Sequence, residues 1–184
     1  MRVRLPLVFV TAAVLVATVT LSAGEDIRIT PIPSGTGVLV SFAVRDAWTL
    51  GTREVLQSGL MLRFEYEVEL KRPAPLWFFD SVLARVRITS RAQFDTLGGG
   101  YKVSRMREGH VVKSEQVRQE TEVRDWLTNI ERVALDPVTP LEINAEYYVH
   151  VRLTTSPRRS ISLWSILPFG KEEITGREPF TYIK

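Results

Sequence analysis

The chain has 184 residues, of which 45% are apolar and 24% are charged, and it contains no cysteine. The lack of cysteine excludes disulfides and an acylated-cysteine anchor, so an ordinary packed core must hold the fold together. Apart from Arg2 and Arg4, 22 basic residues face 21 acidic ones, a net charge of +1; this argues against nucleic-acid binding, which needs a one-sided basic surface.

Residues 1–23 have the pattern of a segment that directs export. Two arginines precede an apolar run from Leu5 to Leu21, and small residues follow up to Gly24. This order predicts a bacterial secretory signal that is cleaved near Ala23. The alternative is an uncleaved anchor, because the run is close to the ~20 residues that span a bilayer. In both cases we expect the rest of the chain to be periplasmic, or anchored to the inner membrane facing the periplasm.

Short strands and one short helix are predicted next. Residues 26–31 and 38–44 alternate apolar and other residues, with prolines and glycines between them. The segment 51–58 is a helix candidate, with Thr52 as its N-cap and Gly59 placed to end it.

The longest alternating stretch of the sequence is 60–70, and a strand is predicted from there to about Arg72. One face carries Leu60, Leu62, Phe64, Tyr66, Val68 and Leu70. The other face begins with Met61 and continues with Arg63, Glu65, Glu67 and Glu69. A period of two separates apolar from charged side chains only in extended backbone, so this is a strand with one face on a core and the other in water.

A second strand is predicted from Val82 to Ile88, with Arg85 and Arg87 on its polar face. If it pairs antiparallel with the long strand, a column of arginines lies beside the column of glutamates. Such cross-strand pairs contribute about 0.2–1 kcal/mol each, which helps to fix the register.

The next segments predict turns, strands and a helix. Gly98-Gly99-Gly100 and Glu108-Gly109 mark turns between strands. Helical spacing then connects Val123, Trp126, Leu127, Ile130 and Val133 or Ala134. Thr121 is the expected cap, Glu120 and Arg124 an i, i+4 pair, and Asp136-Pro137 the end of this helix. A last strand is expected over 143–154.

These elements predict a mainly β fold. We expect an antiparallel, immunoglobulin-like β-sandwich with one or two short helices over residues 25–158, after the signal or anchor segment. Residues 159–184 differ in character and are expected to form an apolar C-terminal extension.

Several blocks resemble a bacterial family known as domain of unknown function 4390. They are the run from Val55 to Arg72, the segment from Phe94 to Val103, the helix with Trp126-Leu127, and the strand from Tyr147 to Leu153. The resemblance implies an exported envelope protein of about this length. Relatives are often encoded near sensor histidine kinases, which hints at signalling. The family pattern implies no catalytic residues.

No catalytic, metal or cofactor motif is recognised. His110 and His150 lack the i, i+4 spacing of a metal pair, and His150 is expected on the outward face of its strand. The three glutamates of the long strand share a water-facing side, where nothing raises a pKa for acid catalysis. The triple glycine is not followed by Gly-Lys-Ser/Thr, so it is not a phosphate loop. We therefore predict a non-enzymatic protein without a cofactor.

Two apolar clusters form the candidate interaction surface. The first contains Trp77, Phe78 and Phe79. The second contains Ile161, Leu163, Trp164, Ile166, Leu167 and Phe169. Exposed apolar patches mark interaction sites, whereas the bland alternative is that these clusters pack on their own domain. The second cluster is also compatible with another subunit or a membrane surface.

The sequence thus predicts an exported interaction or assembly module with an envelope protein as partner, in an oligomeric state that is left open. The alternative is a periplasmic sensory or ligand-binding module linked to a membrane histidine kinase. That alternative requires a closed pocket, lined for example by Tyr66, Phe94 or Tyr147. A hydrolase would need a cleft in which glutamate and histidine side chains converge.

Overall fold

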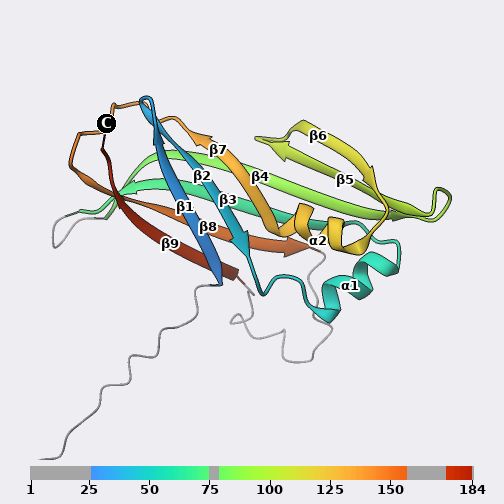
Figure 1. The fold of residues 1–184 in the computed structure, drawn as a ribbon. Helices are drawn as coiled ribbons and strands as arrows, with labels where there is room; N and C mark the ends of the chain where they lie inside the picture. The colour runs from blue at the N-terminus through green and yellow to red at the C-terminus, as the bar shows by residue number, and fades with distance from the viewer. Residues whose placement is uncertain (1–25, 75–78, 157–172, 184) are drawn as a thin grey trace, which may run out of the picture.

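The computed structural model describes residues 26–74, 79–156 and 173–183, where two antiparallel sheets and two short helices form an open sandwich (Figure 1). The predicted mainly β, sandwich-like fold is therefore confirmed. The smaller sheet has the order β1-β2-β7, made of Ile27–Ser34, Gly37–Val44 and Asn129–Leu135. The larger sheet has the order β6-β5-β4-β3-β8-β9. In chain order its strands are β3 Leu62–Arg72, β4 Ser81–Asp95, β5 Gly100–Arg107, β6 His110–Val117, β8 Glu146–Ser156 and β9 Glu173–Thr181.

β3 runs through the interior of the larger sheet, as its long alternation indicates. Phe64 and Tyr66 are completely buried between the sheets, while Glu65 and Glu67 face outward. The strand begins at Leu62, so Leu60 and Met61 precede it and are exposed. Its partners are β4 on one side and β8 on the other, both antiparallel.

The sandwich is closed along one side, where β1 crosses β9 (Figure 1). Gly176 on β9 is buried there, and a Cβ added to it would lie 2.8 Å from the Cβ of Ile27. The glycine is therefore what lets the two backbones approach. On the opposite side β7 and β4 do not meet in this way, and the sandwich is open.

Helix α1 covers Leu50–Gln57 and is displaced by one residue from the predicted segment 51–58. Its N-cap is Thr49 instead of Thr52, and the two threonines bond reciprocally. Thr49 Oγ1 accepts from the Thr52 amide at 3.3 Å, and Thr52 Oγ1 accepts from the Thr49 amide at 2.9 Å. This is a capping box in which threonine replaces the usual glutamate.

Helix α2 covers only Glu120–Thr128, so the prediction of one helix up to Asp136 was wrong in its second half. Residues Asn129–Leu135 are strand β7, in which Ile130 pairs with Phe42 and Val133 with Val40. Branched side chains that can join a sheet gain more from that pairing than from another helical turn.

The start of α2 also differs from the prediction. The N-cap is Gln119, and Thr121 lies inside the helix. Glu120 pairs with Arg53 of α1 instead of with Arg124, which bonds Asp125 at 2.9 Å. The salt bridge therefore joins the two helices.

β4 is longer than predicted, and only part of it has a neighbour on each side. β5 pairs with Ile88–Asp95, so β4, β5 and β6 continue beyond the smaller sheet as an arm (Figure 1). The first half of β4, from Ser81 to Arg87, borders the open side of the sandwich. This half is the basis of the candidate site.

The end of the chain adds a strand that was not predicted. β8 begins at Glu146 instead of 143, and Ile143 is exposed in the preceding loop. β9 then pairs along β8 and forms the edge of the larger sheet. The predicted export segment, residues 1–23, lies outside the described residues.

Candidate functional site

Most residues of the predicted interaction surface lie outside the part of the chain that the structure describes. This holds for Trp77 and Phe78 of the first cluster. It also holds for the whole second cluster, which is Ile161, Leu163, Trp164, Ile166, Leu167 and Phe169. Phe79 is described, and its side chain is 100% exposed directly before β4.

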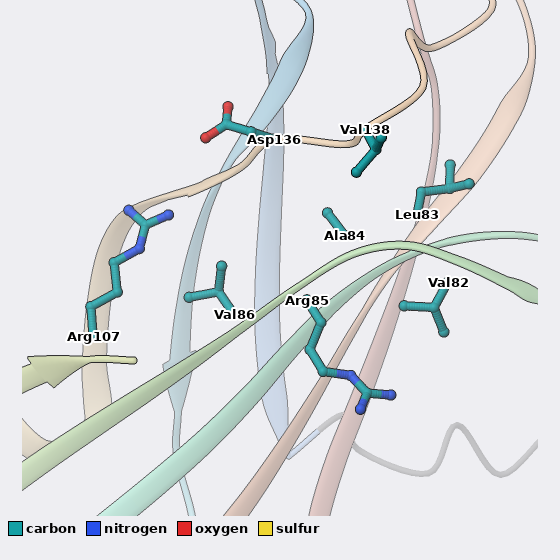
Figure 2. Close-up of a pocket in the computed structure, with 8 residues that line it drawn as sticks. All are labelled: Val82, Leu83, Ala84, Arg85, Val86, Arg107, Asp136 and Val138. Carbon is teal, nitrogen blue, oxygen red and sulfur yellow. The ribbon is translucent and has the colours of Figure 1, made fainter. Parts of the chain in front are cut away.

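A hollow of about 450 Å³ opens between β4 and the segment that follows β7. Figure 2 shows Ala84 and Val86 of β4 on one side, with Asp136 and Val138 on the other. Arg107 of β5 lies at one end, and the side chain of Arg85 points away to the other face of the sheet (Figure 2). The floor of this hollow, which we call the β4 groove, is therefore apolar.

Exposed apolar side chains surround the β4 groove. Val138 is 98% exposed and Val82 is 45% exposed, and Phe79 lies close to Val82 along the chain. The alternation of the segment 82–88 would place Val82 inward. A bulge at Leu83 of β4, opposite Leu70 and Lys71 of β3, changes the register so that Val82 pairs with Lys71. The extra residue turns Val82 to the outer face.

The backbone edge of β4 is open along the β4 groove. The ladder with β5 begins at Ile88, and Glu108 occupies the next position along it. Its amide donates to the Arg87 carbonyl at 3.0 Å, and its carboxylate accepts from the Arg87 amide at 2.5 Å. Among the described residues, nothing continues this pairing beside Ser81–Val86. β4 thus presents about 20 Å of edge, at the usual rise of ~3.3 Å per residue.

The facing edge of β7, by contrast, is already bonded by side chains of β5. Arg107 Nη2 donates to the Ala134 carbonyl at 2.8 Å. Arg105 Nη2 donates to the carbonyls of Trp126 and Asn129, the latter at 3.2 Å, at the junction of α2 and β7. The two arginines connect the arm to the smaller sheet. Of the two edges beside the groove, only that of β4 has no partner among the residues that the structure describes.

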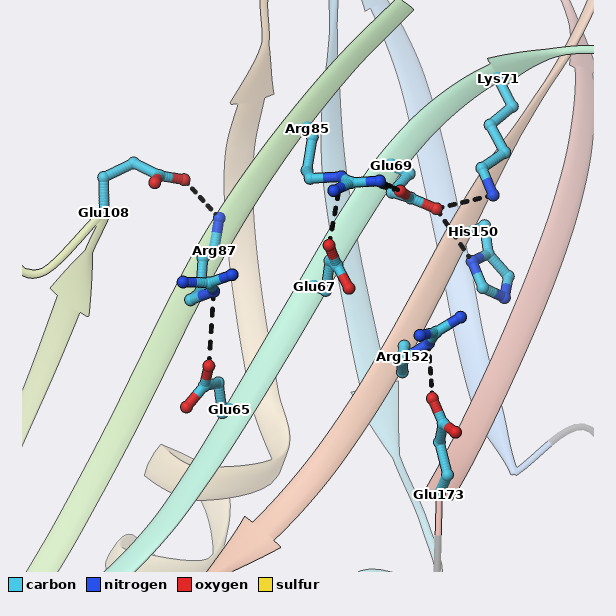
Figure 3. A network of polar contacts seen from close by, with 10 residues as sticks. All are labelled: Glu65, Glu67, Glu69, Lys71, Arg85, Arg87, Glu108, His150, Arg152 and Glu173. Atoms are coloured by element: carbon cyan, nitrogen blue, oxygen red, sulfur yellow. Dashed lines mark hydrogen bonds and ion pairs between the residues drawn. The ribbon is translucent and has the colours of Figure 1, made fainter. Parts of the chain in front are cut away.

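The outer face of the larger sheet is charged, and the predicted columns of glutamate and arginine are confirmed (Figure 3). Glu69 lies directly opposite Arg85, whose Nε is 2.8 Å from Glu69 Oε1 and 3.1 Å from Glu67 Oε1. Arg87 reaches diagonally to Glu65 at 3.4 Å. Half-exposed pairs of this kind contribute little each, so their main effect is on register.

Glu69 and His150 are enclosed titratable groups of this face. Glu69 is 5% exposed, with Lys71 Nζ at 2.7 Å and His150 Nδ1 at 3.4 Å (Figure 3). Burial raises the pKa of Glu69, but hydrogen bonds from Lys71 and Arg85 outweigh it and hold the pKa below its usual 4.5. Burial and the charge of Lys71 lower the pKa of His150 below 6.5. A glutamate kept ionised by two cations is a poor general acid, and neither residue lines the hollows described here.

These pKa shifts predict that the stability of the fold decreases in two stages as the pH is lowered. Both groups bind protons less readily in the folded chain, so each stabilises the fold above its unfolded pKa and loses this effect as pH falls. We expect the urea midpoint to fall first below pH 6.5, from His150. It should fall again below pH 4.5, from Glu69 and from the other carboxyl groups whose pKa is lowered by folding, which are Asp80, Asp95 and Glu142. His150→Gln removes the first stage, whereas His110→Gln, at an exposed position, retains it. A single stage in the unmodified protein contradicts this assignment.

The three aromatic residues proposed to line a ligand pocket lie in different places. Tyr66 is in the core against Phe42, and Phe94 packs on Tyr101 in the arm. Tyr147 packs on Phe180 beside a shallow hollow of about 400 Å³. The structure does not bring them together around one cavity.

A separate cluster near this shallow hollow connects β8, β9 and the start of β4. The Tyr148 hydroxyl donates to Asp80, and the guanidinium of Arg177 lies 3.7 Å from the centre of the Tyr148 ring. Asp80 also accepts from the Ala74 amide at 2.9 Å. Burial and the bond to Asp80 raise the pKa of Tyr148 to about 12. This cluster fixes the chain on both sides of residues 75–78.

Within the described ranges, no group of three or more histidine, aspartate or glutamate residues could hold a metal ion. A search of the same residues for helices that could cross a membrane found none of sufficient length and apolarity.

Comparison with known families decides where this chain belongs. A family model described as "Domain of unknown function (DUF4390)" matches residues 25–159. The chain is a member of the DUF4390 family. The match covers both sheets up to the end of β8 and includes the β4 groove, so the groove lies within the family domain. Searches of curated proteins and of solved structures gave no match.

The sequence analysis missed most of the residues that shape the groove. Asp136 was interpreted as the end of a helix, Glu108 only as part of a turn, and Val138 was not assigned. Glu108 has a positive φ of 48°, which favours the tight turn that brings it to Arg87. The one available signal was Phe79, which the sequence analysis placed in the interaction surface.

Proposed function

We propose that this member of the DUF4390 family is an exported, non-enzymatic interaction module of the cell envelope, which contacts a protein partner through the β4 groove. The observation that carries the proposal is the open edge of β4 with exposed apolar residues around it. Val82 and Val138 line the groove and present exposed apolar side chains beside the open edge of β4. Proteins normally protect such edges, so an open one beside apolar side chains is typical of an interaction site.

Export is the part of the proposal that rests on residues 1–23 alone. Their charged start, apolar run and small residues are those of a secretory signal. The absence of cysteine agrees with a chain that folds without disulfides in any compartment.

Site-specific photo-crosslinking in intact cells tests this function. A photoreactive residue at Val138 or Val82 is expected to give one and the same adduct, because both line the groove. The same probe at Leu97 is the control, since Leu97 is 99% exposed at the tip of the arm, away from the groove. Osmotic-shock fractions from the same cells report whether the protein is in the periplasm or in the membrane fraction.

The adduct must also depend on the groove. Val82→Asp puts a charge beside β4 at a position that is already 45% exposed, so the fold is expected to survive and the adduct to disappear. An unchanged thermal midpoint verifies folding. An adduct that forms equally from Leu97, or that persists in the Val82→Asp variant, contradicts the proposal. Deleting residues 160–184 is not a suitable test, because the deletion also removes β9.

A further inference from the structure

We infer that the β4 groove binds its partner by strand addition, and that the partner is an extended peptide segment in which apolar and acidic residues alternate. The inference rests on the proposed function and adds the mode of binding and the chemistry of the segment. In this mode the peptide becomes a further strand of the larger sheet beside Ser81–Val86, in line with β5.

The backbone of β4 supplies the first part of the argument. Residues two apart along a strand direct their amide and carbonyl groups to the same side. Arg87 uses both groups toward Glu108, so Arg85 directs its own amide and carbonyl to the same open side. Among the described residues, no group of the chain bonds them there. A peptide that pairs with Arg85 therefore continues the ladder that Glu108 ends.

The inner side of the added strand would lie over apolar surface. Its side chains on that face would be neighbours of Ala84 and Val86 and would face Val138 across the hollow of about 450 Å³ (Figure 2). The charged residues of this lining are Asp136, Arg107 and Arg85. Arg107 is already bonded to Ala134, and the side chain of Arg85 points to the outer face (Figure 2). Every second residue of the segment is thus expected to be apolar.

The outer side of the added strand would meet positive charge. Arg85 and Arg87 project from the outer face of β4, and their side chains are 55% and 57% exposed. The glutamates that form ion pairs with their side chains all come from β3, on the side away from the groove (Figure 3). Seen across the sheet, an acidic column on β3 is followed by a basic column on β4. A third column of acidic residues would complete this alternation, because opposite charges on neighbouring strands stabilise pairing.

A synthetic peptide tests the chemistry of the segment. The probe is a fluorescent nine-residue peptide of alternating valine and glutamate, and the matched control replaces every glutamate by lysine. Binding to the full-length protein is measured by fluorescence anisotropy. We expect the glutamate peptide to bind at least about tenfold more tightly, since two arginines would each exchange an attractive neighbour for a repulsive one. Equal affinity, or a preference for lysine, overturns the inferred chemistry.

Backbone methylation tests strand addition itself. Two further peptides carry N-methyl groups at alternate residues, either at the valines or at the glutamates. A peptide added to an edge uses the amides of one set only, so one peptide is expected to lose binding and the other to retain it. If both retain affinity, the peptide is held by its side chains alone and strand addition is wrong. If the unmethylated peptide binds but neither methylated peptide does, the peptide does not pair with the β4 edge through alternate amides, and strand addition is again wrong.

Arg87→Glu is the complementary change in the protein. Arg87 is half-exposed and its only described carboxylate contacts are those to Glu65 and, through its amide, to Glu108, so the fold is expected to be retained. The variant should abolish the preference between the two peptides, because the new glutamate opposes the remaining Arg85. Arg152→Glu, on β8 of the same face, should leave the preference unchanged. If the crosslinked adduct forms in cells but the purified protein binds neither peptide, this mode of binding is wrong and the proposed function still holds.

Discussion

Replacing Tyr66 with alanine is expected to lower the free energy of unfolding by about 3–5 kcal/mol, as for other large core aromatics. Tyr66 is completely buried on β3, and its ring centre is 5.1 Å from that of Phe42 in an edge-on contact between the two sheets. Its hydroxyl donates to the carbonyl of Leu127 in α2 at 2.6 Å. One side chain thus joins β3, β2 and the end of a helix, and urea unfolding monitored by circular dichroism measures its contribution.

Tyr66→Phe separates the hydroxyl from the ring. Burial raises the pKa of Tyr66, so the hydroxyl keeps its proton and donates throughout the working pH range. Its removal leaves a buried helix carbonyl without this donor, which costs about 1–3 kcal/mol. Tyr101→Phe, at a less buried position on β5, is the matched control and is expected within about 0.5 kcal/mol of the unmodified protein. A Tyr66→Phe effect no larger than that of the control contradicts the assigned bond.

Replacing Gly176 with valine is expected to be the other severe change, at about 1–3 kcal/mol or more. Even the Cβ would lie 2.8 Å from Ile27 Cβ and 3.1 Å from the Ile27 carbonyl oxygen. Backbone cannot yield as a flexible side chain does, so β1 must move away from β9 and open the closed side of the sandwich. Thermal unfolding of the purified variant measures the loss.

Thr175→Val is the control for Gly176→Val, because Thr175 is the neighbouring residue on the exposed face of the same strand. Valine favours extended backbone, so this variant should be neutral or slightly stabilised. Equal effects at both positions would mean that β9 tolerates valine wherever it is placed and that the contact with Ile27 does not limit the packing.

The alternation of β3 was enough to predict the fold class, because a period of two is a local property of the sequence. The same holds for Arg85 and Arg87 beside the glutamates, whose columns the structure confirms. In both cases one face is buried and the other is in water, so the sequence pattern is unambiguous.

The end of α2 could not be predicted in the same way. Val123, Trp126, Leu127 and Ile130 satisfy helical spacing, yet Ile130 belongs to β7. A distant partner determines that this residue is in a strand, because Ile130 pairs with Phe42 on β2. Long-range pairing overrides a local periodicity that is equally compatible with helix.

β9 was missed because it contains two residues that normally argue against a strand. Gly176 is required by the approach of Ile27, and Pro179 is tolerated because β9 is the edge of its sheet. Both reasons depend on the tertiary structure, which a local sequence pattern does not contain. The β4 groove was missed for a similar reason, since it joins segments far apart in sequence, β4 and the loop after β7.

The charged outer face has a consequence for how this molecule can associate. A bare antiparallel sheet would otherwise be able to stack flat against the sheet of another copy and aggregate. Here stacking would strip water from ion pairs such as Arg85–Glu69 and Arg152–Glu173, a desolvation penalty that a layer of paired charges recovers poorly. Contacts between molecules are thereby directed to the rim of the sandwich, where apolar side chains and free backbone coincide.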